Sequence, residues 1–274
     1  MTMMKHLLYI IPLVFFMNTP GKAQNGSGEP PKKASEIAFK DGEWFQFRIH
    51  YGIFNASFAT LKIDEKQYNG KSVFHAQGYG ETTGLAKLFF KVEDRYESYF
   101  DKYTGQPYKF IRDINEGGYT KDIEIDFNHN TQKALVNDKK HGVKTTHAVK
   151  DNVQDLISAF YYLRNNYEIS DITVGQTITL NMFFDKENFK FKMKYMGNET
   201  LRTKFGKIDC MKFRPFVQSG RVFKEEESLT LWVSNDKNKI PIRIKADLAV
   251  GSLKADLHNF KGLKYPFKIK VKKR

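Results

Sequence analysis

The chain has 274 residues, a formal net charge of +14 and a single cysteine. This length is enough for one large core or two small ones. One cysteine excludes an intramolecular disulfide, so the stability of the fold has to come from packing. The excess of basic residues favours anionic partners.

The first residues have the pattern of a cleaved secretory signal peptide. Lys5 precedes an apolar run from Leu7 to Met17, and a small residue, Ala23, follows soon after it. The run is too short to cross roughly 30 Å of hydrocarbon. We therefore expect residues 1–23 to be removed and the mature protein to reach the periplasm, with outer-membrane association left open. A lipoprotein would carry a cysteine at the cleavage point, whereas Cys210 lies far downstream.

A polar leader follows the signal peptide. Residues 24–37 are rich in Gly, Pro and Lys and cannot bury enough apolar surface to fold, so we expect them to be flexible. Residues 38–274 are then predicted to form a single β-rich domain. Period-two alternation of apolar and polar residues, which is typical of half-buried strands, is clearest at Phe45–Ile53, Ile123–Phe127, Phe189–Tyr195, Ile240–Ile244 and Phe267–Val271. The last of these predicts that the basic tail forms a final strand.

The remaining predicted elements are hairpin turns and one helix. Asn69-Gly70 and Glu116-Gly117-Gly118 separate alternating runs, which indicates hairpins. The alternation predicts about fourteen strands in all. A helix is expected over residues 151–165, with Asp151 as its N-cap and Gln154 three residues further on.

These elements favour a mainly β fold: a strongly bent antiparallel sheet or half-open β-barrel, with one central helix on its concave face. The absence of βαβ alternation argues against a parallel sheet. The strands before and after the helix could be two similar halves. The chain contains 24 Phe and 14 Tyr, more than a tight small barrel needs. An apolar cavity is one explanation and thick sandwich packing is the other.

Catalytic and cofactor motifs are missing from the sequence. The stretch 69–72 resembles a phosphate loop, but Glu65 stands where its first glycine belongs. Gly78, Gly80 and Gly84 miss dinucleotide-binding spacing and indicate a bend or bulge in the sheet instead. No zinc-binding spacing of His and Cys and no nucleophile elbow is present. We therefore expect no cofactor and no metal, and a non-catalytic protein rather than an enzyme.

Three parts of the chain carry a family resemblance: Gly42–Phe47 with Tyr51–Ile53, the helical stretch Asp155–Arg164, and Leu231–Ser234 with Ile240–Ile244. Together, over residues 38–258, they resemble the exported Gram-negative family named domain of unknown function 3108 (DUF3108). The resemblance implies a mostly antiparallel β protein of the cell envelope, and it supplies no catalytic residues. A looser analogy at the level of the fold connects such sheets to periplasmic lipoprotein carriers.

The sequence therefore predicts an envelope protein that binds a lipid-like, apolar or amphipathic ligand, or a partner protein, in a bent sheet. The side chains predicted to line its interior are Phe45, Phe47, Phe189 and Phe191. An anionic surface, such as membrane phosphates rather than nucleic acid, is expected to meet Lys268, Lys270, Lys272, Lys273 and Arg274. The alternatives are a scaffold or assembly factor of an outer-membrane complex, an unrecognised hydrolase, and, for the tail, a purely solubilising role.

Overall fold

The computed structural model describes residues 37–270, apart from gaps at 53, 85–86, 88–90, 168–171, 217–227 and 249–250. The predicted signal peptide, nearly all of the predicted leader, and three of the predicted surface residues, Lys272, Lys273 and Arg274, lie outside the described residues. Those predictions remain predictions.

A single antiparallel sheet of fourteen strands makes up most of the described chain. Its strands are β1 (Trp44–Tyr51), β2 (Phe54–Tyr68), β3 (Lys71–Thr82), β4 (Val92–Asp101), β5 (Pro107–Glu116), β6 (Tyr119–Asn128), β7 (Lys133–Asp138), β8 (Val143–Ala148), β9 (Thr177–Phe184), β10 (Glu187–Thr203), β11 (Gly206–Pro215), β12 (Leu229–Ser234), β13 (Pro241–Asp247) and β14 (Ser252–Lys261). The helix is α4 (Leu156–Asn166). The sheet is bent but not closed, which confirms the predicted half-open, mainly β fold with one helix among the described residues.

The strand order joins the two ends of the domain at the centre of the sheet. Consecutive strands pair from β1 to β8 and from β9 to β14, and β1 pairs with β14, so that β8 and β9 are the two edges. The predicted hairpins are confirmed. Their turns place Asn69, Gly70, Gly117 and Gly118 at positive φ, as tight two-residue turns require.

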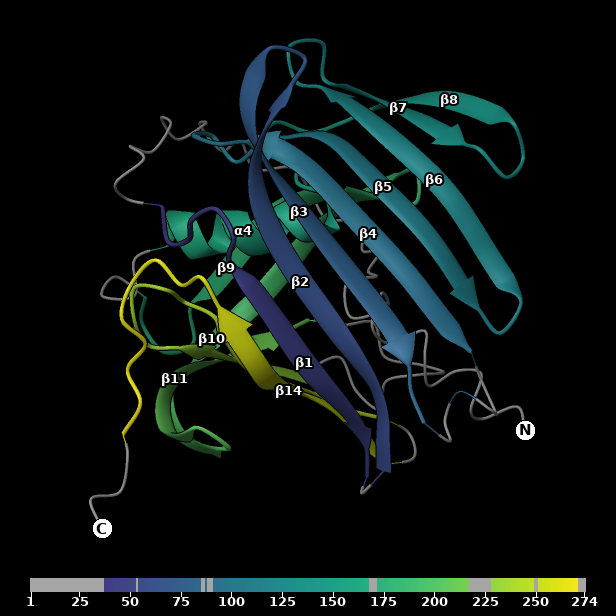
Figure 1. Ribbon diagram of the computed structural model, residues 1–274. Coiled ribbons are helices and arrows are strands. Elements are labelled where there is room, and N and C mark those ends of the chain that lie inside the picture. Colours follow the sequence, from purple (N-terminus) through teal and green to yellow (C-terminus); the bar gives the residue numbers. More distant parts are fainter. Residues whose placement is uncertain are drawn as a thin grey trace.

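Helix α4 lies on the concave side of the sheet and contacts strands from both halves (Figure 1). The largest apolar cluster joins β4–β7 to β9–β10 and includes α4 residues such as Leu156 and Ala159. The segment leading into the helix runs along the β9 edge. There the Gln154 amide donates to the Asn181 carbonyl at 2.9 Å, and the Gln154 carbonyl accepts from the Phe183 amide at 3.0 Å.

That pairing corrects the predicted start of the helix. The N-cap is Asp155 rather than Asp151: its Oδ1 accepts from the Ile157 and Ser158 amides at 2.8 and 2.7 Å. The Ser158 hydroxyl accepts in return from the Asp155 amide at 2.9 Å, which completes a capping box. Because the backbone of Gln154 is held by β9, the helix cannot begin before that residue.

The predicted final strand in the basic tail is also wrong. After β14 the described residues make only an isolated bridge, in which the Lys270 and Lys207 amides donate to each other's carbonyls at 2.8 and 3.2 Å. The physical reason is topological: β14 already pairs with β1 and β13, and the tail meets the sheet only at the start of β11, where Lys207 lies outside the pairing with β12. The tail instead packs Phe267 against Phe260, with ring centroids 4.9 Å apart.

Candidate functional site

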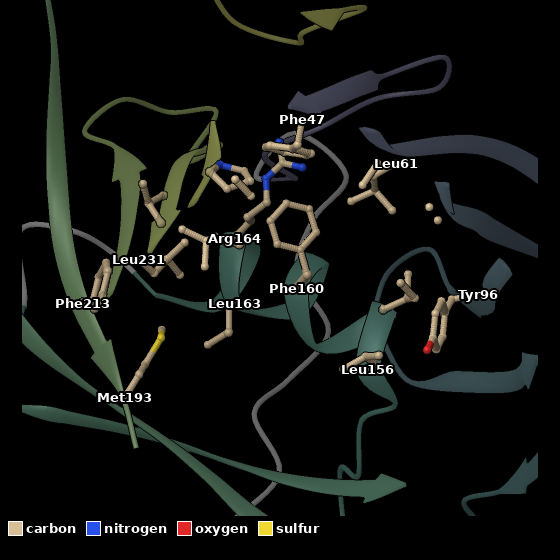
Figure 2. Close-up of a pocket in the computed structure, with 18 of the residues that line it drawn as sticks. Phe47, Leu61, Tyr96, Leu156, Phe160, Leu163, Arg164, Met193, Phe213 and Leu231 are labelled. Carbon is tan, nitrogen blue, oxygen red and sulfur yellow. The ribbon is translucent and has the colours of Figure 1, made fainter. Parts of the chain in front are cut away.

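A cavity of about 300 Å³ lies between α4 and the concave face of the sheet. This volume is at the lower end of the range found for small-molecule sites. Figure 2 shows side chains from all sides of the cavity, and its labelled apolar members include Phe47, Leu61, Leu156, Phe160, Leu163, Met193, Phe213 and Leu231. The lining is therefore almost wholly apolar and comes from both halves of the sheet and from the helix.

The helix presents one face to the cavity and packs its other face into protein. Leu156, Phe160 and Leu163 follow helical spacing and line the cavity. On another side of α4 the Tyr161 ring is fully buried, with its centroid 4.7 Å from that of Phe39 and 5.4 Å from that of Phe100. The cavity is thus bounded by a helix whose orientation is set by packing on its far side.

A buried ion pair holds the C-terminal end of α4. Arg164 donates from Nη1 and Nη2 to the two carboxylate oxygens of Glu43 at 2.6 and 2.9 Å, and from Nε to the Asn238 carbonyl at 2.9 Å. The Glu43 side chain is completely buried and that of Arg164 is 2% exposed. Since bidentate pairing fixes the guanidinium, Arg164 anchors the helix to the centre of the sheet, although it also borders the cavity.

Two glycines of β3 open the space under the helix. A Cβ atom at Gly78 would lie 3.5 Å from Ile157 Cδ1, an ordinary van der Waals contact, so the absence of a side chain leaves only a small space beside the helix here. Gly80 is buried, yet a Cβ atom there would meet nothing within 4 Å. Pairing of β3 with β2 and β4 continues through both positions without a register shift, so of the two predicted alternatives, bend or bulge, the bulge is absent at Gly78 and Gly80.

One end of the cavity wall is polar. Asp94 and Tyr96 of β4 line it, and Glu116 lies beside Asp94 at the end of β5. Both carboxyl side chains are buried, with their residues only 3% exposed. Burial raises the pKa of Asp94. Burial, followed by the neighbouring Asp94, raises the pKa of Glu116 to about 8.

Basic residues near this carboxyl pair are bound to a different acid. Arg112 Nη1 and Lys121 Nζ each lie 2.7 Å from a carboxylate oxygen of Asp185, in the turn between β9 and β10. The Arg112 guanidinium also lies over the Phe184 ring, 4.7 Å from its centroid. These contacts connect β5 and β6 to the opposite half of the sheet at the polar end of the cavity.

Only one of the four residues predicted to line the interior borders the cavity. Phe47 lines the cavity, and Phe45 is fully buried beside it, with ring centroids 6.2 Å apart. Phe189 and Phe191 lie in the large apolar cluster and are not among the residues that line the cavity. Met193, the next residue on their face of β10, does line it.

Sequence reasoning missed most of the cavity wall, including the helix face, Gly80, and the carboxyl pair. The signal for the helix face was present in its apolar spacing. No local signal marks Gly80 or the carboxyl pair, because their roles depend on which strands become neighbours.

The described part of the predicted anionic contact surface is exposed. Lys268 and Lys270 are both exposed, and Lys270 Nζ lies 2.5 Å from a carboxylate oxygen of Asp209. Contact with an anionic surface stays a prediction.

Other kinds of site have little support in the described chain. No group of three or more His, Cys, Asp or Glu residues there could hold a metal ion. The Cys210 thiol is buried, and this burial raises its pKa to about 12, which is unsuited to nucleophilic chemistry. Among the helices of the described residues, none combines the length and apolar character needed to span a membrane.

Comparisons with known proteins agree with this architecture. A family model described as "Protein of unknown function (DUF3108)" matches residues 46–258. No curated protein matches the chain. A solved β-barrel-like protein of the domain of unknown function DUF1849 from Brucella abortus superimposes with a TM-score of 0.53. It is 8% identical, and the match covers 83% of this chain and 100% of that protein, so the likeness concerns the fold alone.

Two further solved structures match more loosely. A candidate lipoprotein from Parabacteroides distasonis is 12% identical, with a TM-score of 0.34 over 82% of this chain and 98% of its own. A DUF1089 family protein from Pseudomonas aeruginosa is 8% identical, with a TM-score of 0.33 over 66% of this chain and 87% of its own. Likeness at this level carries no functional argument.

Proposed function

The chain belongs to the DUF3108 family of proteins of unknown function, and from that premise we propose that it is an exported, non-catalytic envelope protein that binds one lipid-like molecule in the cavity under α4. The observation that carries the proposal is a deep cavity with an almost wholly apolar lining between α4 and the sheet. Binding of an apolar molecule there removes this surface from water, which is favourable.

The shape and chemistry of the cavity support an amphipathic or apolar occupant. Its walls are apolar except at one end, and its volume of about 300 Å³ suits a single hydrocarbon chain or a molecule of similar size rather than a lipid with several chains. Two methionines, Met193 and Met211, line it and can adjust to differently shaped chains. Export itself rests on the signal-peptide pattern of residues 1–23.

A substitution at Gly80 tests the proposal. Its backbone is outside the left-handed region, a Cβ atom there would meet nothing within 4 Å, and the residue lines the cavity, so the side chain of Gly80→Leu is expected to occupy ligand space. The matched control is Gln77→Leu, which adds the same side chain to the other face of β3. The probe is N-phenyl-1-naphthylamine, a neutral apolar dye, titrated by fluorescence, with native mass spectrometry to detect lipid that purifies with the protein.

We expect the natural protein and Gln77→Leu to bind the dye equally and to carry lipid. Gly80→Leu should bind at least about tenfold more weakly, with an unchanged circular dichroism spectrum. A natural protein that takes up neither dye nor lipid, or a Gly80→Leu protein that binds as well as the natural one, contradicts the proposal.

A second candidate function, a scaffold in an envelope complex, is favoured by the edge strand β8. Among the described residues β8 pairs only with β7, and two apolar side chains of this hairpin, Leu135 and Val143, are 39% and 46% exposed. Open edges and exposed apolar residues are common at strand-addition interfaces. Crosslinking in isolated envelopes separates the candidates, since a scaffold should give one stoichiometric partner through β8 and a carrier should not.

A further inference from the structure

We propose that the ligand is an amphiphile with a protonated amine head group, which binds at Asp94 and Glu116 while its apolar chain occupies the cavity. This inference rests on the proposed function and names the chemical class of the ligand. It predicts a preference for amines over fatty acids.

The register of the sheet places Glu116 beside Asp94, and Asp94 lines the cavity. Val92, Asp94 and Tyr96 alternate along β4, and all three line the cavity. Glu116 pairs directly opposite Val92, which makes it the diagonal neighbour of Asp94 on the same face. Asp94 therefore meets the ligand space directly, and Glu116 supports it from the adjacent strand.

One acceptor of this cluster lacks the partner that burial requires. Glu116 Oε1 is buried and makes no hydrogen bond within the described residues. Buried polar atoms are nearly always satisfied by protein, water or ligand. An ammonium group offers three donors and a positive charge. It can thus replace the proton that two adjacent buried carboxyls must otherwise share, and it supplies a donor to the unsatisfied oxygen.

The surrounding charges favour a cation over an anion. The ionisable groups gathered at this end are Asp94 and Tyr96 on β4, Arg112 and Glu116 on β5, Lys121 on β6, and Asp185 in the β9–β10 turn. Three of them are carboxyls and two are cations, and both cations are already paired with Asp185. A carboxylate ligand would therefore add a further negative charge beside Asp94 and Glu116.

The other cations that border the cavity are also held by protein. Arg164 is paired with Glu43, and Lys239 Nζ donates to the Tyr167 carbonyl at 2.7 Å. A ligand carboxylate would have to displace one of these contacts. The whole protein, in contrast, carries a formal charge of +14 and attracts anions non-specifically. The net positive charge of the protein would repel an amine. A measured preference for the amine would therefore come from the local site at Asp94 and Glu116.

The experiment compares dodecylamine, dodecanol and dodecanoic acid as competitors of N-phenyl-1-naphthylamine at about pH 7, below their micellar concentrations. We expect the amine to bind at least about tenfold more tightly than the acid. Since the amine stays protonated well above this pH, its affinity should rise from about pH 6 to pH 8 as the pair releases its proton. Calorimetry in buffers of different ionisation enthalpy should detect that released proton.

The variant Asp94→Asn/Glu116→Gln keeps the shape of the pair and removes its charge. Its affinity for dodecylamine should fall at least about tenfold. Its affinity for dodecanol should be unchanged, and this result would show that the cavity is intact. The matched control is Asp113→Asn, an exposed carboxyl of β5 that faces Arg95 instead. Equal affinities for amine and acid, or amine binding unaffected in the double variant, overturn this inference. If none of the three displaces the dye because no apolar probe binds, the proposed function itself has failed.

Discussion

At the scale of single residues, Glu116 links burial to the pH dependence of stability. Its pKa in the folded protein is raised to about 8, first by burial and then by Asp94, from an ordinary value of 4.5. The folded protein therefore retains a proton that the unfolded chain releases. Stability is fully present below the unfolded pKa and is lost as pH rises toward the folded pKa.

Glu116→Gln should abolish this loss. Between about pH 5 and pH 8 the natural protein should lose roughly 2–4 kcal/mol of unfolding free energy relative to the variant. The measurement is urea unfolding at several pH values, with Asp113→Asn as the exposed control on the same strand. Parallel pH profiles for the natural protein and Glu116→Gln would show that Glu116 titrates normally.

The same residues show how far single positions could be predicted from the sequence. Alternation along one strand was enough to place Phe45 and Phe47 on an inward face, because it needs no knowledge of other strands. The Asp94–Glu116 contact needed the register of β4 against β5, which local patterning does not specify. Apolar faces were thus predictable, and the polar chemistry between strands was not.

At the scale of elements, two aspartates four residues apart, Asp151 and Asp155, precede α4, and only Asp155 caps it. The sequence predicts the cap at Asp151. The structure selects Asp155, because Gln154 is bonded to β9. This choice depends on a contact between distant segments, and the missing final strand has the same kind of cause, since β14 already pairs with β1 and β13.

Alanine at the two aspartates should therefore have different effects. Asp155→Ala removes the cap and the acceptor of the Ser98 hydroxyl, which donates to Oδ2 at 2.6 Å, in a fully buried position. The expected loss is about 2 kcal/mol. Asp151 is exposed, so Asp151→Ala should cost no more than about 0.5 kcal/mol. Urea unfolding followed by circular dichroism measures both, and a larger loss for Asp151→Ala would contradict the assignment of the cap.

At the scale of the whole molecule, three kinds of contact hold the two halves of the sheet around the cavity. Pairing of β1 with β14 joins them at the centre, and α4 packs between them. At the polar end, where the sheet is not closed, Asp185 connects the β9–β10 turn to Arg112 and Lys121. The first two contacts are extensive, so the ion pairs at Asp185 should govern opening only at their own end.

Asp185→Asn tests whether these ion pairs control opening only at the polar end. Asp185 has a φ of 44°, and asparagine tolerates the left-handed region as well as aspartate does, so the substitution removes charge without straining the turn. It leaves the buried Arg112 without its acidic partner, and we expect local opening to become easier by about 1–3 kcal/mol. Hydrogen exchange should accelerate in the β9–β10 turn and in the adjoining ends of β5 and β6, while amides between β1 and β14 keep their protection.

Lys186→Asn, in the same turn, leaves both ion pairs in place and should exchange like the natural protein. Unchanged exchange in Asp185→Asn would mean that the apolar core alone holds this end together, whereas faster exchange throughout the sheet would mean that the ion pairs support the entire fold.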